Sequence, residues 1–592
     1  MGDCSVHFCL VLQRRSRVTA SFGYRPLNLS NQHPLSAASG IANVGDKMYS
    51  YNGTSAPSHR ALTTLYRAKF YESVAAGEIK PLIVPYHFLG EFLLVGYLCI
   101  PHVGRPWLYA TRWLVLAAII TFEVKKILET SSISLGTGFH LGVGSAWIII
   151  WSMTLLLWTN PQLDARRVER RLGGNIARDE KGSPKQKNVM ACNQHSNAND
   201  GLKVRLQQKG HTKDTSVRPE GMVKKDGRPL TATEYFWQPY PKDSFRDRLS
   251  WVLDLVINLR LPGWNWEIST NPGLPAKVKA SLGEPIDLKA MELKSRVGTR
   301  LFTSRSQFLM TQLHRFILGY LLLDALKVTV IKDPYFLVGP NNYPLPTHLA
   351  SLSPTMLDIY HKLFSLIAII VAMEFISVTV TFFCILLGPS ILGVRGEAWM
   401  YPTLWGSLDN VYTKGLVGFW GGWWHQIFRF GFLAPSNYLI RQGLLSPRSR
   451  TIKVISLLTA FTASGVIHAC ASITQFPRTV PSNQFLFFLL QPLGILLQIG
   501  FCTFFESRIS KLTPQTRRAG NFAYTFTWMY ITCPLLLDDF ARGGLWLYEP
   551  LPISPLRWLG LGEEADQRWW VWDHFGTWYA GGSRWWESGL LI

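Results

Sequence analysis

The sequence has few charged residues and no framework of cysteines. Charged side chains make up 17% of the 592 residues, whereas soluble domains carry about a quarter. The eight cysteines are scattered, with no Cys-x-x-Cys pair and no cluster of cysteine with histidine. This pattern excludes a disulfide framework, and we expect no metal site. The apolar stretch at 8–12 is followed, not preceded, by arginines, so we expect no secretory signal.

The sequence is instead rich in long apolar runs. Hydrophobic residues make up 47% of the chain, with 23 Trp and 33 Phe. A helix that crosses a bilayer needs roughly 20 apolar residues, and a water-soluble fold of this size could not bury so many such runs. The composition therefore predicts an all-α, polytopic integral membrane protein with about eight transmembrane helices. The runs are 81–100, 108–122, 141–158, 316–331, 363–387, 454–471, 485–505 and 522–537.

The net charge of +22 does not indicate a nucleic-acid partner, because the basic residues gather between apolar runs. Basic loops that flank membrane helices mark the cytoplasmic side. The segment 166–225 and the loop 393–450 are both basic, and alternating crossings place both in the cytoplasm. Residues 179–228 are rich in Asn, Gln, Lys and Gly, a composition that favours a disordered loop.

These features divide the chain into five regions. We predict a partly disordered amino-terminal region at 1–80 and the first transmembrane helices at 81–160. A basic, largely disordered cytoplasmic insert follows at 161–242. The core of the protein extends over 243–562, and a tail rich in tryptophan completes the chain at 563–592.

Polar residues inside apolar runs identify a first candidate site. Ser464, His468 and Ser472 are spaced by four residues, so they share one face of a helix. Ionisable groups within a membrane are costly and are often functional. A neutral imidazole in such surroundings can accept a proton from an alcohol. The alternative is a histidine that only forms a hydrogen bond with a neighbouring helix, and the local pattern leaves both interpretations open.

The aromatic run at 419–429 is a second candidate site. Trp420 and Trp424 precede His425, Gln426 and Arg429. Nearby glycines weaken a straight helix, so we predict a bent or re-entrant segment, which is tolerated only inside protein or along a cavity. Tryptophan belts at the membrane interface are the competing interpretation.

Together these motifs resemble the membrane-bound O-acyltransferase superfamily, and within it the wax-synthase-like acyltransferases of fungi, of the type that acetylates secondary metabolites. The run from Phe419 to Arg429 is similar to the family's FW…WHQ…R motif, and Ser464 to His468 is similar to its S/G-x-x-x-H motif. Further similarities lie at 260–264, 401–407, 491–494 and 543–552. Leu261 stands where the RGxGW motif has glycine. The resemblance covers roughly 243–562.

The resemblance implies an enzyme that moves an acyl group from acyl-CoA, its co-substrate, to the hydroxyl of a hydrophobic alcohol. His468 then corresponds to the general base, and His425 positions the acceptor or stabilises charge. We expect Trp420, Trp424, Gln426 and Ser464 to line the substrates, and Arg429 and Arg441 to engage CoA phosphates. Cys470 lies two residues from His468 and faces away from it, which argues against a nucleophilic cysteine.

The resemblance favours acetyl-CoA as donor, a terpenoid or meroterpenoid acceptor, and a multi-pass protein of the endoplasmic reticulum. A synthase of long-chain wax esters or sterol esters is the alternative. A proton-coupled transporter is a candidate of a different class, but the two halves show no internal repeat of the kind many transporters have. We expect no bound cofactor beyond the co-substrate, and the oligomeric state stays open.

Overall fold

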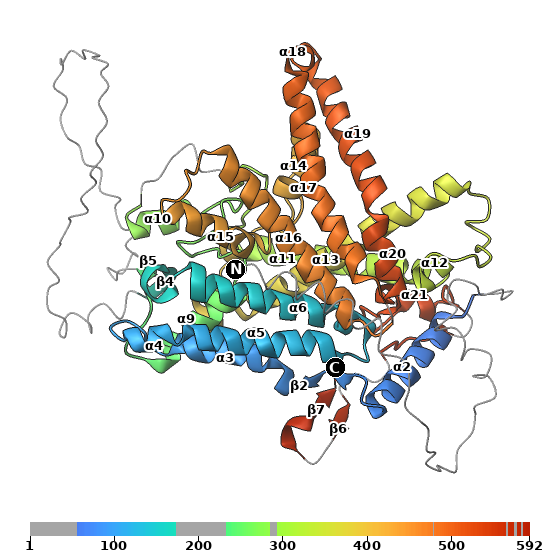
Figure 1. Cartoon of the computed structure of the whole chain (residues 1–592), viewed down its shortest axis with the longest axis horizontal. Coiled ribbons are helices and arrows are strands. Elements are labelled where there is room, and N and C mark those ends of the chain that lie inside the picture. Colours follow the sequence, from blue (N-terminus) through green and yellow to red (C-terminus); the bar gives the residue numbers. More distant parts are fainter. Residues whose placement is uncertain are drawn as a thin grey trace, which may run out of the picture. The chain divides into compact units, whose positions relative to one another are not determined.

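The computed structural model describes residues 56–172, 233–284, 293–477, 479–563, 566–572, 577–581 and 584–591. All of the described residues belong to one compact unit, Ser55–Ile592. The predicted disordered stretch at 179–228 and most of the amino-terminal region lie outside the described residues. The fold is overwhelmingly helical (Figure 1).

The first helices carry the amino-terminal half of the fold. They are α2 (His59–Ala75), α3 (Leu89–Cys99), α4 (Pro106–Ala110), α5 (Arg112–Glu129), α6 (Leu135–Met153) and α7 (Pro161–Asp164). Helices α3, α5 and α6 pack side by side. The central helices are α9 (Phe245–Ile257), α10 (Ala276–Leu282), α11 (Arg305–Val330), α12 (Pro334–Val338) and α13 (Pro354–Leu392).

The last helices contain the second half of the site. They are α14 (Asp409–Gly418), the π-helical turn η7 (Phe419–Trp423), α15 (Arg429–Arg441), α16 (Arg450–Thr474), α17 (Pro481–Phe504), α18 (Glu506–Ile509), α19 (Pro514–Thr532), α20 (Pro534–Arg542) and α21 (Pro555–Trp558). Local sequence sets several helix starts, because Ser353, Ser449 and Thr513 accept a hydrogen bond from the first turns of α13, α16 and α19. Helices α17 to α19 project as a hairpin (Figure 1).

Short strands form only small sheets at the edges of the helices. They are β1 (Lys80–Pro81), β2 (Ile83–Val84), β3 (Thr130–Ser131), β4 (Arg167–Leu172), β5 (Thr233–Gln238), β6 (Trp578–Ala580) and β7 (Ser588–Leu591). β4 and β5 pair antiparallel, Arg167 opposite Gln238, so both ends of the predicted insert at 161–242 are ordered. β7 of the carboxy-terminal tail pairs with β2 and β6.

Among the described residues, five helices are long and apolar enough to cross a membrane. They are Pro106–Glu129, Leu135–Trp158, Pro354–Gly396, Arg450–Thr474 and Pro481–Phe504. Each contains one predicted apolar run, and the protein is an all-α, polytopic membrane protein. The predicted number of about eight is not confirmed. Run 81–100 gives a shorter apolar helix, run 316–331 lies in α11, and run 522–537 is divided between α19 and α20.

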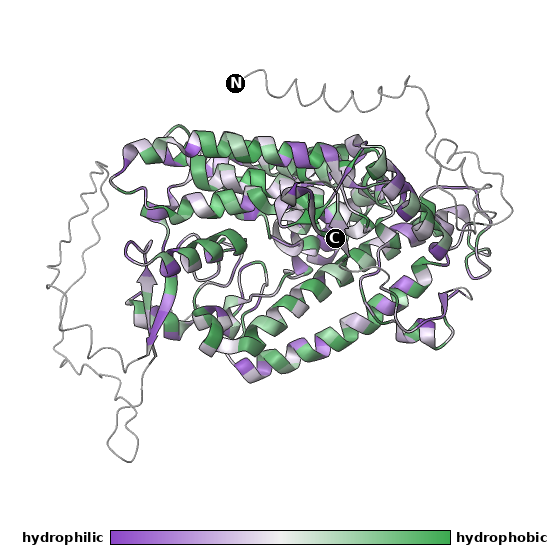
Figure 2. Cartoon of the chain, turned by 90° about the horizontal axis from the view of Figure 1, so that it is seen from below, coloured by the Kyte–Doolittle hydropathy of each residue, from purple (hydrophilic) through white to green (hydrophobic). Residues whose placement is uncertain are grey.

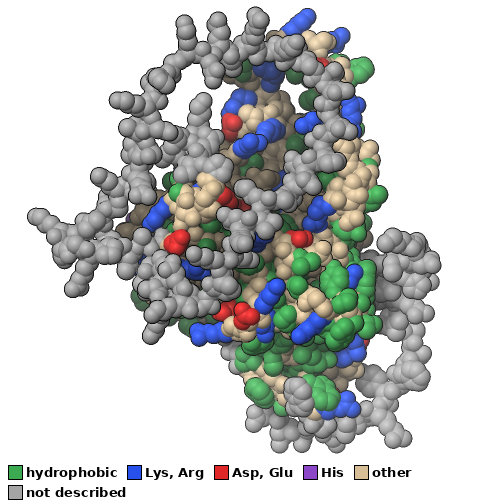
Figure 3. All heavy atoms as spheres, turned by 90° about the vertical axis from the view of Figure 1, so that its left-hand side faces the viewer, with side chains coloured by type: hydrophobic (Ala, Val, Ile, Leu, Met, Phe, Trp, Pro, Cys, Tyr) green, Lys and Arg blue, Asp and Glu red, His purple; other side chains and the backbone are tan. Residues whose placement is uncertain are grey.

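The outer faces of these helices are apolar, as expected for contact with lipid. Hydrophobic residues predominate along the helices in Figure 2, and one side of the protein carries a broad patch of hydrophobic atoms (Figure 3). On α13 alone, Ile367, Ile376 and Val380 each have more than half of their surface exposed. Contiguous apolar surface of this extent would be unfavourable in water.

The core helices α6 and α16 approach each other closely. A Cβ on Gly142 would lie 2.2 Å from the carbonyl oxygen of Cys470, so only glycine permits this contact. The hydroxyl of Thr474 donates to the carbonyl of Gly138 at 2.7 Å, and the hydroxyl of Ser131 donates to the carbonyl of Thr474 at 2.7 Å. Small residues and interhelical hydrogen bonds are the typical means of joining helices in membranes.

Candidate active site

The segment that carries the aromatic motif is bent, as the sequence predicts. Gly415 has φ of +60° within α14, a conformation that favours glycine. The N–H of Leu416 donates to Oε1 of Gln498 on α17 at 3.0 Å, which satisfies a backbone group at the bend. The indole of Trp420 donates to Oε1 of Gln491 at 3.2 Å. Polar side chains of α17 therefore hold the bent segment inside the protein.

The turn at 405–407 supports the same segment from the other side. The N–H of Gly406 donates to the carbonyl of Trp423 at 3.0 Å. A Cβ at Gly406 would lie 1.9 Å from the carbonyl oxygen of Gly422. The turn at 405–407 and the aromatic run therefore form one packed unit around η7.

Gln426 fixes the loop that presents His425. Its amide Nε2 donates to the carbonyls of Trp420 and Trp424, both at 2.7 Å, and its Oε1 accepts from Nη1 of Arg429 at 2.6 Å. All of these partners belong to the same motif. The structure thus gives Gln426 a positioning role in the loop, in addition to its place beside the cavity described below.

His468 lies on α16 among aromatic rings. Its imidazole stacks on Phe488, with ring centroids 4.3 Å apart and planes 23° apart. Its Nδ1 is buried and has no hydrogen-bond partner among the described residues, and the same is true of Nδ1 of His425. A buried polar atom without a partner is costly and calls for an explanation. The simplest one is that these atoms meet a ligand.

Both histidines line one large cavity of about 1960 Å³. Ordinary ligand pockets measure roughly 300–1,000 Å³, so this cavity has room for two substrates. Seven of the eight residues predicted for the site line it: Trp420, Trp424, His425, Gln426, Arg429, Ser464 and His468. Segments that are separate in the sequence therefore meet around a single space.

Arg441 does not belong to this group. It is exposed at the end of α15, and its guanidinium donates to the carbonyl of Trp158. It is absent from the residues that line the cavity. The expectation that Arg441 binds CoA beside the histidines is therefore not supported by its position, because sequence spacing along α15 does not show which way the helix faces.

Arg260, the first residue of the motif-like stretch at 260–264, is a further candidate for the site. It lines the cavity, donates to the carbonyl of Thr403 at 3.0 Å and to Oδ1 of Asn271 at 2.8 Å, and keeps a buried Nε without a partner among the described residues. Burial lowers the pKa of Arg260 to about 10, so it stays charged at neutral pH.

The positive charge of Arg260 also lowers the pKa of His425. His425 lies outside the five candidate spans, and burial lowers its pKa from 6.5 to about 3, with smaller contributions from His468 and Arg260. At neutral pH this imidazole is therefore uncharged. A neutral ring can donate one hydrogen bond and accept another, as positioning an alcohol or a carbonyl requires.

Leu261, next to Arg260, stands at the position where the motif has glycine. Its φ is +54°, and it is the one described residue other than glycine with a positive φ. The left-handed conformation costs roughly 1–2 kcal/mol for a residue with a Cβ. Its side chain is fully buried, and this burial offsets the strain. Leu261 therefore adopts the left-handed backbone conformation that glycine would allow, although it departs from the motif.

One end of the cavity is polar. Arg167 donates to Asp254 at 3.2 Å, and Arg395 forms ion pairs with Asp254 at 2.8 Å and Glu169 at 2.6 Å. These four residues line the cavity together with Arg260. The loops that are predicted to be cytoplasmic therefore contribute charged side chains to this end of the cavity. The rest of the lining is mainly apolar.

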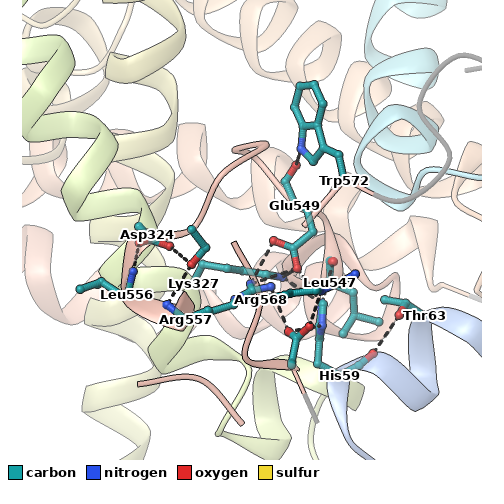
Figure 4. Close-up of polar contacts among 12 residues, drawn as sticks. His59, Thr63, Asp324, Lys327, Leu547, Glu549, Leu556, Arg557, Arg568 and Trp572 are labelled. Atoms are coloured by element: carbon teal, nitrogen blue, oxygen red, sulfur yellow. Dashed lines mark hydrogen bonds and ion pairs between the residues drawn. The ribbon is translucent and has the colours of Figure 1, made fainter. Parts of the chain in front are cut away.

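A buried group of charges joins α2, α11 and the carboxy-terminal segment (Figure 4). Lys327 donates to the carbonyl of Trp546 at 2.7 Å, and His59 Nε2 lies 3.1 Å from the carbonyl of Leu547. Asp324 accepts instead from Ser554 and from the N–H of Leu556. Asp324 and Lys327 therefore bond to different partners, although they lie one helical turn apart.

The same group contains three side chains arranged as in a metal site. One ligand atom each of His59, Glu549 and Asp566 lies within 4.8 Å of the others. However, Arg557 donates to both oxygens of Glu549 at 3.0 Å and to Asp566 at 2.9 Å, and Arg568 donates to Asp566 at 2.8 Å. Because cations already occupy these carboxylates, the group is better described as a buried ion-pair network.

The segments around the cavity are similar to those of known proteins. Residues 401–490, which contain the whole aromatic motif and His468, match the membrane bound O-acyl transferase family. The chain is 33% identical over 99 residues to acetyltransferase spyB of Aspergillus fumigatus, covering 17% of this chain and 16% of the relative. It is 32% identical over 166 residues to acetyltransferase eriL of Hericium erinaceus, covering 28% and 42%.

A longer match extends beyond this region. Acetyltransferase ple2 of Rhodocybe pseudopiperita is 24% identical over 301 residues, covering 51% of this chain and 68% of the relative. The chain spans less than half the length of spyB and eriL. No solved structure matches the chain significantly. The resemblance is confirmed: residues 401–490 match the membrane bound O-acyl transferase family, and the chain is similar to several fungal acetyltransferases.

Proposed function

We propose that the protein is an acyl-CoA-dependent O-acyltransferase of the endoplasmic reticulum membrane. It transfers an acetyl group to the hydroxyl of a hydrophobic acceptor, such as a terpenoid or meroterpenoid, in the biosynthesis of secondary metabolites. The observation that carries the proposal is the meeting of His425 and His468, each with an unpartnered Nδ1, in one mainly apolar cavity. The printed names of the relatives support acetyl as the group transferred.

In the proposed reaction, His468 acts as the general base. Its imidazole takes the proton of the acceptor hydroxyl while the oxygen forms a bond to the thioester carbon. The carbon–sulfur bond breaks, CoA leaves as the thiolate, and the imidazolium returns its proton to that thiolate. His425 donates a hydrogen bond to the carbonyl oxygen as negative charge develops there.

The two substrates reach this point from different sides. Acyl-CoA enters at the polar end of the cavity, where Arg260 and Arg429 supply positive charge for its phosphates. The acceptor enters from the bilayer beside α13, whose Ala372 and Ile376 line the cavity. α13 packs on α11 along its length, while α16 packs on α6 and α17, which leaves an apolar side of the cavity for a lipid-soluble alcohol.

A direct test measures transfer of labelled acyl groups into extractable lipid. Membranes with the protein and matched membranes without it are given acetyl-CoA or palmitoyl-CoA together with terpenoid, sterol and fatty-alcohol acceptors. Label from acetyl-CoA in a terpenoid ester, only in membranes with the protein, is the expected result. Absence of transfer from both donors to every acceptor contradicts the proposal.

The volume of the cavity also favours a second candidate, a synthase of long-chain wax or sterol esters. A space of about 1960 Å³ exceeds what an acetyl group and one polycyclic alcohol need. The same experiment separates the two candidates, because a long-chain synthase prefers palmitoyl-CoA and a fatty alcohol or sterol.

A further inference from the structure

Three phenylalanine rings surround His468 on the side that faces α6, α17 and α20. Phe488 stacks on the imidazole at 4.3 Å, Phe139 lies 6.1 Å from it and Phe540 lies 6.5 Å from it, all measured between ring centroids. Phe139 and Phe540 contact each other edge to face at 5.2 Å. All three residues line the cavity. We refer to Phe139, Phe488 and Phe540 as the phenylalanine wall.

The wall is firmly held. Asp539, the neighbour of Phe540 on α20, is fully buried and accepts hydrogen bonds from Ser472 and Gln484, both at 2.7 Å. Ser472 lies one turn after His468 on α16, and Gln484 lies on α17. On the α6 side, Gly142 packs directly on the backbone at Cys470. Because α6 and α17 pack on α16 and α20 packs on α17, the rings cannot move apart easily.

The order of groups along the cavity places the acyl group against this wall. Arg429 donates to Gln426, the neighbour of His425. The ring centroid of Trp424 lies 5.4 Å from that of His425 and 5.8 Å from that of Trp420, and Trp420 lies 6.1 Å from Phe488 of the wall. Contacts between rings therefore lead from the loop of His425 through the two tryptophans to the wall beside His468. A thioester that enters from the polar end and reaches His468 has its acyl group directed towards the rings. Residues of α13, Ala372 and Ile376 among them, also line the cavity, and we assign that side to the acceptor.

We propose that the phenylalanine wall limits the donor to short acyl groups, so that Phe139 and Phe540 determine acyl-chain length. This inference rests on the proposed acyltransferase function and deepens it. An acetyl group that reaches His468 lies beside Phe139 and Phe540, whereas each further methylene must displace one of these two rings. Phe488 also positions the imidazole by stacking, so its replacement affects every donor equally, but replacement of Phe139 or Phe540 changes the preference between donors.

The test compares acetyl-CoA with butyryl-CoA as donors for the wild type and for Phe139→Leu, Phe540→Leu and the double variant. A misfit of one or two methylenes in a tight site changes kcat/KM by roughly 10- to 200-fold. We expect each single variant to raise the ratio of butyryl to acetyl kcat/KM at least about tenfold, and the double variant to raise it further. Phe504→Ala, on the exposed end of α17 away from the cavity, is the matched control.

The outcomes are separable. An unchanged ratio in both single variants that still transfer acetyl overturns the wall as a determinant of chain length. A wild type that already uses butyryl-CoA as well as acetyl-CoA overturns it too. A wild type that transfers no acyl group from any donor overturns the proposed function instead. Should one variant fail to fold, as judged by size-exclusion chromatography, the other variant still decides the question.

Discussion

At the scale of single residues, the proposed chemistry depends on two histidines that line the cavity. His468 stacks on Phe488 and lines the cavity, while His425 belongs to a loop that the hydrogen bonds of Gln426 hold in place. The two histidines come from elements 43 residues apart in sequence, and neither has another described partner for its Nδ1. An unpartnered Nδ1 on each ring is consistent with the proposed mechanism, in which His468 takes a proton and His425 donates a hydrogen bond.

We expect His425→Ala to slow acyl transfer by about 10²–10³-fold, mainly in kcat, because a hydrogen bond to the developing oxyanion is lost. His425→Gln retains a donor and should recover part of the rate. Steady-state kinetics with acetyl-CoA and a fixed acceptor measure both. Arg441→Ala is the matched control, since Arg441 lies outside the cavity and its variant should stay within about twofold of the wild type. Full activity of His425→Ala contradicts this role.

Arg260 should contribute to donor binding. We expect Arg260→Met, which keeps the length but removes the charge, to raise the KM for acetyl-CoA by about tenfold or more, because a charge-assisted contact is worth roughly 1.5–3 kcal/mol. Kinetics with acetyl-CoA and with a truncated donor that lacks the adenosine diphosphate portion test this. An equal loss for both donors would show that Arg260 supports the fold and does not contact the phosphates.

The sequence reveals the site only in part at this scale. The spacing of Ser464 and His468 and the run from Trp420 to Arg429 identify both histidines at the cavity, together with Gln426, Arg429 and Ser464. Arg260 is not predicted as a site residue, because nothing in its own segment shows that it faces the same cavity as the two histidines. Arg441 is misassigned because a position along a helix does not reveal its face without the neighbouring helices.

At the level of elements, the bend in α14 is the feature on which the site depends. Gly415 allows the turn, and Gln498 satisfies the backbone there. A Cβ on Gly415 would lie 2.0 Å from Nε2 of Gln498. The glycine pattern predicts a bent segment, and the structure confirms it. The two glutamines of α17 that hold the bend are not predictable, because they are separated from it by more than 70 residues.

We expect Gly415→Ala to lower stability by about 1–3 kcal/mol, the usual cost of a strained backbone conformation, and to reduce activity by displacing His425. Thermal unfolding in detergent and acetyl transfer measure the two effects. Gly500→Ala on α17 is the control, because a Cβ there meets no atom within 4 Å. A Gly415→Ala protein as stable and active as Gly500→Ala would show that the bend is not needed.

Apolar length predicts the spanning helices well, since each of the five candidate spans contains a predicted run. It fails where proline or charge divides a run. Pro534 separates α19 from α20 inside the run 522–537. The small pairing of β4 with β5 also lies beyond such a prediction, because the strands are distant in sequence and carry no strong alternation.

At the scale of the whole protein, the buried ion-pair network ties the amino-terminal helix α2 to the carboxy-terminal segment. Burial lowers the pKa of His59 well below 6.5, and the positive charge of Lys327 lowers it further. The folded protein therefore holds His59 neutral, whereas the unfolded chain binds a proton near pH 6.5. This contribution to stability is present above pH 6.5 and is lost as the pH falls below it.

We accordingly expect the thermal midpoint of the wild type to fall between pH 7.5 and pH 5.5, and to fall less in His59→Gln. The difference between the two proteins isolates His59 from the other histidines. His314→Gln, at an exposed position on α11, is the control and should follow the wild type. A pH dependence that is identical in His59→Gln and the wild type would rule out this coupling.

The most direct test of the account is the rate of acetyl transfer by the His468→Ala protein, at expression matched to the wild type and with folding checked by size-exclusion chromatography. Removal of a general base costs about 10²–10⁴-fold. With His468 as the base, we expect a loss of this size in kcat, with little change in the KM for acetyl-CoA. Wild-type rates from a well-folded His468→Ala protein would contradict the assignment of His468 as the base on which the mechanism rests.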